Sequence, residues 1–324
     1  HIEEGRWLKN QKYLTDYINF WFSEEANPRQ YSNWLVNAIW NYCLVSGDYK
    51  LAEDLLQQFV DSYEGWEKTN LHKIGLFWSV DDRDGGEYSI SSHGLRPTLN
   101  SYLYADAQTI ALIAKRLDND KIAKRFQAKA DNLKKMMHER LWDSTDKFFK
   151  NVHLENSTTE VETWDFQKMD QDHNVREIYG FIPWKFNIAD ERHNDAWLQI
   201  IDTNGFSAPF GFTTAEQRHP RFMKYRKKRC QWDGSVWPFT SSITLKTMAN
   251  FLKSCNQNIL TKDHYFKGLK TFAFSQHRTL SFGEVIPWIG ESLHPYSGRW
   301  LSRDMNLESC PPISKIVSIS GSIK

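Results

Sequence analysis

Apolar residues recur every three or four positions over most of the chain, the spacing of helices that bury one face. Residues 8–22, for example, place Leu14, Ile18 and Phe22 on one stripe. The same spacing predicts helices over residues 30–45, 49–66, 100–117, 120–141, 191–201, 235–252 and 261–277. Short polar turns join several of these segments, so we expect antiparallel helical hairpins.

Three long stretches interrupt the helical pattern. Residues 71–95, 216–237 and 283–300 combine Gly and acidic residues with Trp or Tyr and show no sustained period, which predicts loops. Residues 147–154 favour a short strand, residues 155–174 a surface excursion, and residues 303–324 an irregular tail. Hairpins joined alternately by tight turns and long loops predict an all-α fold over residues 1–302. We expect an (α/α)6 toroid of the six-hairpin type, incomplete at its C-terminal end, with the long loops gathered around one cleft.

Charge and hydropathy narrow the classes of partner. The chain carries 41 Lys and Arg against 40 Asp and Glu, a net charge of +1, which argues against nucleic acid or an anionic membrane as the main partner. The basic run KYRKKRC from Lys224 is typical of a solvated face. No stretch approaches the ~18 apolar residues that a membrane span needs. No basic and apolar leader follows His1, so we expect a processed or partial chain and predict neither its compartment nor its oligomeric state.

The aromatic content adds a first hint of function. The chain holds 14 Trp, 13 Tyr and 20 Phe, or 15% of its residues. A large helical core accounts for most of them. An indole ring, however, also stacks on the C–H faces of sugars while its N–H donates to hydroxyl groups. The excess of Trp therefore favours a carbohydrate as the substrate.

Metal and cofactor chemistry is not indicated. Cys43, Cys230, Cys255 and Cys310 are scattered without a CxxC spacing and are expected to be buried thiols, with disulfides as the alternative. The chain has no HxH or HExxH, no GxGxxG or GxxxxGK, and no GxSxG. We therefore predict neither a metal site nor a cofactor.

Carboxylates in the long loops are the candidate catalytic groups. Hydrolysis of a glycosidic bond needs one protonated and one ionised carboxyl group, in different environments. Asp84 in DDRDGGEYS and Glu291 in WIGESLHP lie in different loops among aromatic residues. The alternative for Asp84 is a turn cap, and Asp81, Asp82 and Glu87 are competing candidates.

Three segments carry a family resemblance. CQWDGSVWPF, residues 230–239, resembles the QWD-G-Trp-Pro signature of trehalases and a corresponding segment of glycoside hydrolase family 63. GESLHPYSGRW resembles the Glu-x-Tyr-x-Pro-x-x-Gly segment that carries the general base in that family. DDRDGGEYSIS and the following RPTLNSYLYADAQTIALIAKRL look like its general-acid loop and next helix. From residue 7 to residue 301, the chain resembles the mannosylglycerate-hydrolase-like, family 63-like glycoside hydrolases of clan G.

The resemblance implies an inverting hydrolase that cleaves an α-glucoside or α-mannoside, small or terminal. It places Asp84 as general acid, with Asp82 as the other choice because this loop lacks the usual lead-in, and Glu291 as general base. The two carboxyl groups of an inverting site lie about 6.5–9.5 Å apart. Trp232, Asp233, Gly234 and Trp237 are expected to line the sugar subsite. The expected neighbours are Trp78, Tyr88, Asn100, Tyr104, Trp184 and Trp300.

Two other classes remain open. Toroids also host sugar epimerases and polysaccharide lyases, which use His or Tyr as base, so His93, His219 or His294 would then be central. A non-catalytic carbohydrate-binding domain would keep the cleft and lose the reaction.

Overall fold

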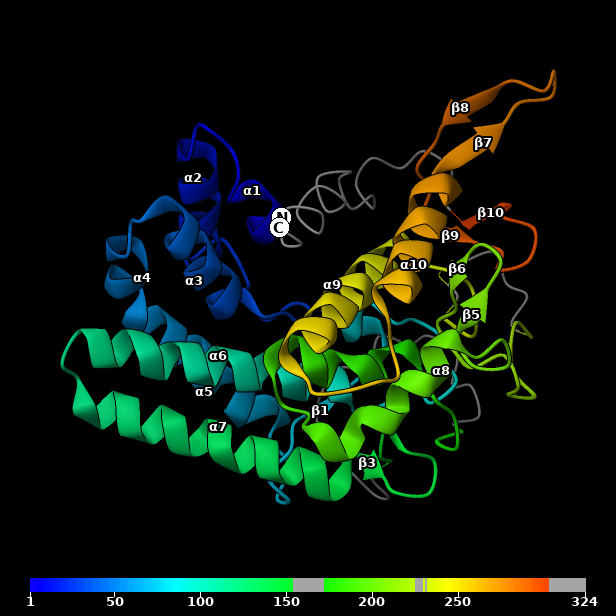
Figure 1. Cartoon of the computed structure of the whole chain (residues 1–324). Helices are drawn as coiled ribbons and strands as arrows, with labels where there is room; N and C mark the ends of the chain where they lie inside the picture. Colours follow the sequence, from blue (N-terminus) through cyan, green and yellow to red (C-terminus); the bar gives the residue numbers. More distant parts are fainter. Residues whose placement is uncertain (154–171, 225–229, 231, 303–324) are drawn as a thin grey trace. The chain divides into compact units, whose positions relative to one another are not determined.

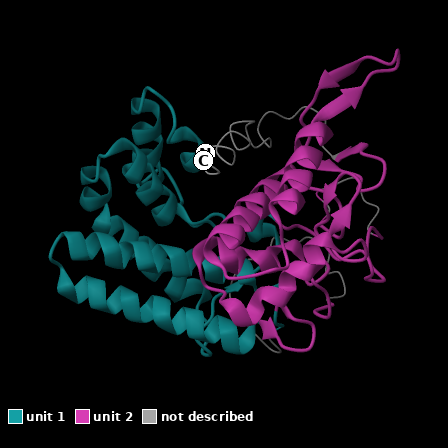
Figure 2. Ribbon diagram, viewed as in Figure 1, with its two compact units in different colours: residues 1–85, 93–141, 152–166 teal, residues 86–92, 142–151, 167–324 magenta. Residues whose placement is uncertain are grey.

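The structure is a computed structural model that describes residues 1–153, 172–224, 230 and 232–302 (Figure 1). The chain divides into two compact units, coloured separately in Figure 2. The first comprises His1–Gly85, His93–Leu141 and Val152–Phe166, and the second comprises Gly86–Ser92, Trp142–Asn151 and Gln167–Lys324. The chain therefore passes from one unit to the other inside DDRDGGEYS, the stretch with four candidate carboxylates.

The first unit is built around two long helices. α6 and α7 lie side by side as a helical hairpin, and α3 and α5 also contact α6 (Figure 1). Pro97 starts α6 because its fixed φ suits a first helical position, and the Asn119 side chain caps α7 by accepting from the Ile122 N–H at 3.2 Å. The elements of this unit are α1 (Ile2–Gly5), α2 (Lys12–Trp21), α3 (Leu35–Ser46), α4 (Lys50–Asp54), α5 (Leu56–Asn70), β1 (Trp78–Ser79), η1 (Asp82–Asp84), β2 (Gly94–Leu95), α6 (Pro97–Arg116) and α7 (Asp120–Arg140).

The hydrophobic periodicity located most of these helices. The helices predicted over residues 100–117 and 120–141 are confirmed as α6 and α7. The prediction of one continuous helix over residues 49–66 was wrong: Leu55, with φ −90° and ψ 3°, leaves the helical region and separates α4 from α5. The short helix α1 has no counterpart in the prediction.

The second unit combines helices with short antiparallel strand pairs. β9 pairs with β10, and β7 pairs with β8. The elements of this unit are β3 (Trp142–Asp143), β4 (Phe148–Phe149), η2 (Ile178–Phe186), η3 (Glu191–Trp197), α8 (Leu198–Ile201), β5 (Ser207–Ala208), β6 (Gly211–Phe212), α9 (Pro238–Ser254), α10 (Lys262–Ser275), β7 (His277–Thr279), β8 (Val285–Pro287), β9 (Ser292–Leu293) and β10 (Trp300–Ser302).

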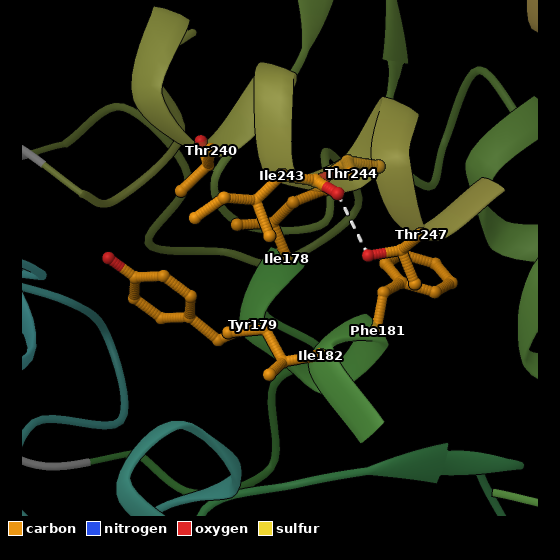
Figure 3. Close-up of a pocket in the computed structure, with 8 residues that line it drawn as sticks. All are labelled: Ile178, Tyr179, Phe181, Ile182, Thr240, Ile243, Thr244 and Thr247. Carbon is orange, nitrogen blue, oxygen red and sulfur yellow. Dashed lines mark hydrogen bonds between the residues drawn. The ribbon is translucent and has the colours of Figure 1, made fainter. Parts of the chain in front are cut away.

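η2 packs along the buried face of α9 (Figure 3). The gap between them is lined by apolar side chains and Thr methyl groups, and it has no room for a water molecule. Thr247 turns its hydroxyl back to the Ile243 carbonyl at 2.8 Å, so its polar atom is satisfied within α9. The lining residues are Ile178, Tyr179, Phe181, Ile182, Thr240, Ile243, Thr244 and Thr247. We therefore assign this gap to core packing.

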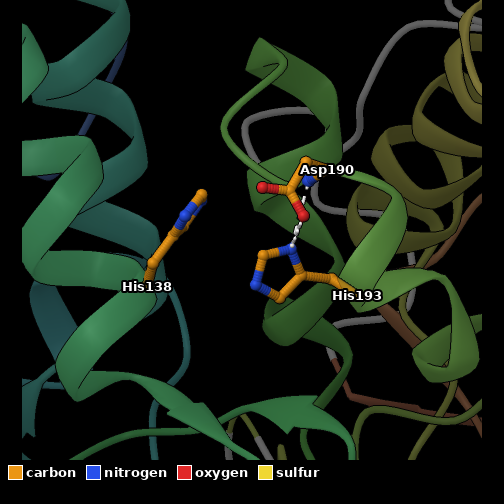
Figure 4. A group of neighbouring side chains, drawn as sticks. All are labelled: His138, Asp190 and His193. Carbon is orange, nitrogen blue, oxygen red and sulfur yellow. Dashed lines mark hydrogen bonds and ion pairs between the residues drawn. The ribbon is translucent and has the colours of Figure 1, made fainter.

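A reciprocal cap starts η3 (Figure 4). The Asp190 carboxylate accepts from the Arg192 N–H, while the Asp190 N–H donates to Nδ1 of His193 at 3.1 Å. The Arg192 guanidinium lowers the pKa of Asp190 to about 2. Asp190 thus stays ionised at neutral pH, the form that caps a helix N-terminus best.

The predictions for the loops have mixed outcomes. Residues 283–300 are not helical, as predicted, but they contain β8, β9 and the start of β10 rather than loop alone. The expected strand in residues 147–154 is confirmed as β4, which pairs with β3. The excursion over residues 155–174 lies mostly outside the described residues, as do most of the basic run after Lys224, Cys310 and the tail over residues 303–324.

Two further observations concern the described part of the chain. Its helices are all too short or too polar to cross a membrane. Cys43, Cys230 and Cys255 are present as thiols; Cys43 is buried as predicted, whereas Cys230 and Cys255 are partly exposed, so the prediction of burial was wrong for these two. Burial raises the pKa of Cys43 to about 11, which makes this thiol inert at neutral pH.

Candidate active site

Glu291 lies against the segment that carries the WDG motif. It directly precedes β9, and Leu293 of that strand exchanges two backbone hydrogen bonds with Val236, at 2.9 and 2.8 Å. The Glu291 side chain is largely buried, with 8% of the residue exposed. The Cys230 thiol lies 3.8 Å from its Oε2 and donates to it. The backbone pairing thus brings together two motifs that are about sixty residues apart in the chain.

Trp232 connects this region to the stretch DDRDGGEYS. Its indole ring stacks on Trp237 (4.4 Å between centroids, 18° between planes) and on Tyr179 (5.3 Å, 22°). Its Nε1–H donates to Oε2 of Glu87 at 3.0 Å. Because only 2% of Trp232 is exposed, protein covers both faces of its ring, and its N–H edge makes the contact with Glu87.

Gly234 has a steric reason to be glycine. Its φ of +142° lies outside the range of ordinary L-residues, and an added Cβ would stand 2.5 Å from the Phe222 ring. Its N–H donates to Oγ1 of Thr214 at 3.0 Å, and the carbonyl of the preceding Asp233 accepts from Met223 at 2.9 Å. These bonds fix the backbone on which Trp232 and Asp233 are mounted.

Asp84 has the environment of a structural anchor. Its side chain is fully buried, and Arg96 donates to its Oδ2 at 2.6 Å. Ser32 and Ser79 donate to Oδ1 at 2.5 and 3.0 Å, and Thr98 donates to Oδ2. A carboxylate that accepts on both oxygens from this many donors is directed inward, which does not suit a group that must give a proton to a substrate.

Asp82, the other acid considered from the sequence, is also in the first unit. Burial, and then the neighbouring charge of Asp81, raise the pKa of Asp82 to about 6. Asp81 itself lies 3.4 Å from Nδ1 of His93. A raised pKa is a property that a general acid needs, although buried structural carboxylates show it too.

Glu87 differs from both aspartates. It is partly exposed, and it belongs to the segment Gly86–Ser92, which is part of the second unit. That unit also contains Glu291, Trp232 and Trp237. Glu87 and Glu291 therefore both contact the start of CQWDG, one through the Trp232 indole and the other through the Cys230 thiol.

The remaining residues predicted for the subsite fall into two groups. Trp237, Asp233, Gly234, Tyr88 and Trp300 belong to the second unit with Glu291. Trp237 is buried and donates to Oγ of Ser235 at 2.9 Å, while Trp300 is partly exposed and donates to the His277 carbonyl at 3.2 Å.

The other group serves the core. Trp184 packs in an aromatic cluster with Phe149, Phe181, Trp197 and Phe251. Asn100 is fully buried and bonds to both backbone groups of Phe77. Burial raises the pKa of Tyr104 to about 12, and Trp78 is buried in β1.

Sequence reasoning missed several residues around the site. Cys230, Tyr179 and Glu177 received no role, although the first belongs to the motif CQWDG and the others to EIYGFIPW. Only the contact of Tyr179 with Trp232 reveals its place, since nothing in the local spacing does. Within either unit, the described residues bring no three His, Cys, Asp or Glu ligand atoms together as a metal site would require.

Comparisons with known proteins identify a family and a fold. The family model of the mannosylglycerate hydrolase MGH1-like glycoside hydrolase domain matches residues 1–306. A solved structure named "Sialidase" is 34% identical, with a TM-score of 0.86 over 99% of this chain and 29% of that one. The chain thus spans less than a third of that protein. None of the curated proteins that were compared matches the chain.

More distant structures show the fold. The family 63 mannosylglycerate hydrolase from Thermus thermophilus, in complex with glucose, has a TM-score of 0.65 at 12% identity, over 91% of this chain and 75% of that one. A family 78 rhamnosidase of a Bacillus species reaches 0.52 at 11% identity, over 88% and 25%. The likeness to the family 63 enzymes confirms the predicted helical toroid class; the predicted gap at its C-terminal end lies outside the described residues.

Proposed function

The chain belongs to the mannosylglycerate hydrolase MGH1-like glycoside hydrolases, and from this membership we propose that it hydrolyses an α-glycosidic bond with inversion. Glu291 is the general base that activates water, and Glu87 is the general acid that protonates the leaving oxygen. The observation that supports this pairing most directly is that both carboxylates contact the start of CQWDG, at Cys230 and Trp232. Hydrolysis by two carboxylates requires such a pair at one site.

Glu291 suits the base because it is largely buried and its carboxylate accepts a hydrogen bond from the Cys230 thiol. A thiol is a weak and uncharged donor, so this contact orients the carboxylate without neutralising it. A carboxylate oriented in this way retains basicity toward a water molecule. The resemblance of GESLHPYSGRW to the family's base segment points to the same residue.

Glu87 replaces Asp84 in the role that the resemblance assigned to the acid. Asp84 is bound to Arg96 and three hydroxyl groups, whereas Glu87 is partly exposed and accepts from the Trp232 indole N–H. The indole N–H is a neutral donor, so this contact positions the carboxyl group without adding a charge beside it, as suits a group that carries the transferable proton. Asp82 is the alternative general acid, because its pKa is raised.

The proposed substrate is an α-glucoside or α-mannoside that is small or presents a terminal sugar. Its non-reducing sugar would lie between Asp233 and the edges of Trp237 and Trp300. Because the faces of Trp232 are covered, Trp300 is the tryptophan of this group with ring surface left for a sugar. Asp233 would accept from sugar hydroxyl groups through charge-assisted hydrogen bonds.

The test is an NMR time course with the purified protein on a panel of α-glucosides, α-mannosides and an α-sialoside. The sialoside is included because a 34% identical structure is named a sialidase. We expect a β-configured sugar to appear first, and no product with Glu291→Gln or Glu87→Gln.

Other products would assign another chemistry. Early α-configured sugar would indicate retention, an unsaturated sugar would indicate a lyase, and sugar binding without turnover would indicate a carbohydrate-binding domain. Full activity of Glu87→Gln together with inactive Asp82→Asn would move the acid to Asp82.

A further inference from the structure

The segment that carries Glu87 has a conformation that its own residues do not favour. Tyr88 and Ser92 have φ values of +59° and +54°, in the left-handed region where side chains other than Gly, Asn and Asp are uncommon. Two turn hydrogen bonds, from Ser89 to the Gly86 carbonyl (3.1 Å) and from Ser92 to the Ser89 carbonyl (3.3 Å), close the segment locally. Contacts from outside must hold such a segment in place.

Glu177 supplies the most specific of these contacts. The Ser91 N–H donates to its Oε1 at 3.0 Å, and the Ser91 hydroxyl donates to its Oε2 at 2.6 Å. Both carboxylate oxygens therefore bind one residue. Since Glu177 is only 8% exposed, these two bonds replace the water that would otherwise stabilise its charge.

Asn151 binds the same segment from another side. Its Nδ2 lies 3.1 Å from the Ser91 carbonyl and 3.0 Å from the Ser92 carbonyl. Asn151 therefore binds the two carbonyl groups next to the strained Ser92, while Glu177 binds the N–H and the hydroxyl group of Ser91. The position of Ser91 is determined by two buried side chains.

Glu177 is also coupled to the residue that binds Glu87. It directly precedes η2, and Tyr179 in the first turn of η2 stacks on Trp232. Trp232 in turn donates to Glu87. Trp232 thus binds the Gly86–Ser92 segment near its start, at Glu87, and Glu177 binds it near its end, at Ser91. Tyr179 links the two, because it stacks on Trp232 and lies two residues after Glu177.

We propose that Glu177 is a positioning residue for the general acid: by binding both donors of Ser91, it sets where the Glu87 carboxyl group lies relative to the leaving oxygen. This inference rests on the proposed function, because it assumes that Glu87 is the acid. It predicts a specific defect. A misplaced acid slows the departure of a poor leaving group and has little effect on one that departs without protonation.

The experiment compares Glu177→Gln with the wild-type protein on two glycosides of the same sugar, one with an alkyl and one with a nitrophenyl aglycone. The amide keeps the size of the side chain and offers Ser91 one acceptor oxygen in place of two. We expect kcat to fall about 10–100-fold on the alkyl glycoside and to change little on the nitrophenyl glycoside, with KM nearly unchanged. Ser91→Ala, which removes the 2.6 Å bond from the other side, should show the same selectivity.

The matched control is Glu216→Gln. Glu216 is a buried carboxylate of the same unit, but it pairs with Arg176 at 2.8 Å, outside the Gly86–Ser92 segment. We expect it to lower the melting temperature and to leave the ratio of the two kcat values unchanged. Equal losses on both glycosides for Glu177→Gln, or no loss, would overturn the inference. A wild-type protein that cleaves neither glycoside would instead overturn the proposed function on which it rests.

Discussion

Asp84 and Glu87 stand three residues apart in one acidic stretch and have opposite surroundings. Asp84 is fully buried, accepts from Arg96 and three hydroxyl groups, and belongs to the first unit. Glu87 is partly exposed, accepts from the Trp232 indole, and belongs to the second. The difference lies in the surroundings, since the two side chains carry the same chemical group.

This contrast separates two uses of a carboxylate. Several donors and a guanidinium that bind both oxygens of a buried carboxylate make the group part of the fold. A neutral donor orients the group while leaving its proton exchangeable. Asp84 is therefore expected to matter for stability and Glu87 for catalysis.

The largest expected effect is catalytic. Glu87→Gln should lower kcat by about 10²–10⁴-fold, the usual contribution of a general acid, because the amide cannot donate the proton at the pH of the reaction. The melting temperature should change little, because a Gln oxygen still accepts from Trp232. Steady-state kinetics and thermal unfolding of the same preparation check both halves. A large loss of stability would show that Glu87 is a structural residue as well.

Asp84→Asn should give the reverse pattern. It removes the counter-charge that Asp84 supplies to the Arg96 guanidinium, whose side chain is 2% exposed, and this is expected to cost about 3–5 kcal/mol of unfolding free energy. Denaturant titration measures this value. If the folded variant instead retains its stability and loses turnover, the assignments of Asp84 and Glu87 must be exchanged.

Asp106 extends the comparison between Asp84 and Glu87. It is a buried carboxylate, like Asp84, but no cation of the described residues contacts it. It accepts the Asn37 N–H at 2.9 Å, and burial raises its pKa from 3.8 to about 7. The folded state then holds a proton that the unfolded state releases, so stability should fall as pH rises from about 4 to 7.

The matching variant is Asp106→Asn, which keeps the acceptor and removes the titration. Relative to this variant, the wild-type protein should lose on the order of 3 kcal/mol of unfolding free energy between pH 4 and pH 8. Parallel pH dependences of the two proteins would show that Asp106 has an ordinary pKa.

The smallest expected effect comes from changing Gly234, whose backbone conformation positions the neighbouring Trp232. Gly234→Ala forces a residue with a Cβ into φ +142° and against the Phe222 ring, at a cost of about 1–3 kcal/mol. Because the backbone beside Trp232 must shift, kcat should fall moderately as well. Gly47→Ala is the control, since Gly47 also has a positive φ (77°), ends α3, and has no atom within 4 Å of an added Cβ. Unchanged kcat in Gly234→Ala would separate this backbone from the site.

Much of the fold followed from local pattern. α6 and α7 were located to within a few residues because a helix that buries one face needs apolar side chains at helical spacing. The break at Leu55 was not foreseeable, since the apolar spacing continues through it and the backbone leaves the helical region all the same. The place of Trp184 was not foreseeable for a related reason: the structure packs it in an aromatic cluster, and a Trp in such a cluster has the same sequence signature as a Trp in a sugar site.

By itself, the sequence determined most of the helices, the family and the two motifs around Trp232 and Glu291, because each depends on residues that are close together in the chain. Only the tertiary structure decided which partners the carboxylates of DDRDGGEYS have. Arg96 binds Asp84 from twelve residues away, and Trp232 reaches Glu87 from 145 residues away. The charge and proton affinity of a carboxyl group are set by the groups that surround it in space, and the order of residues does not specify those.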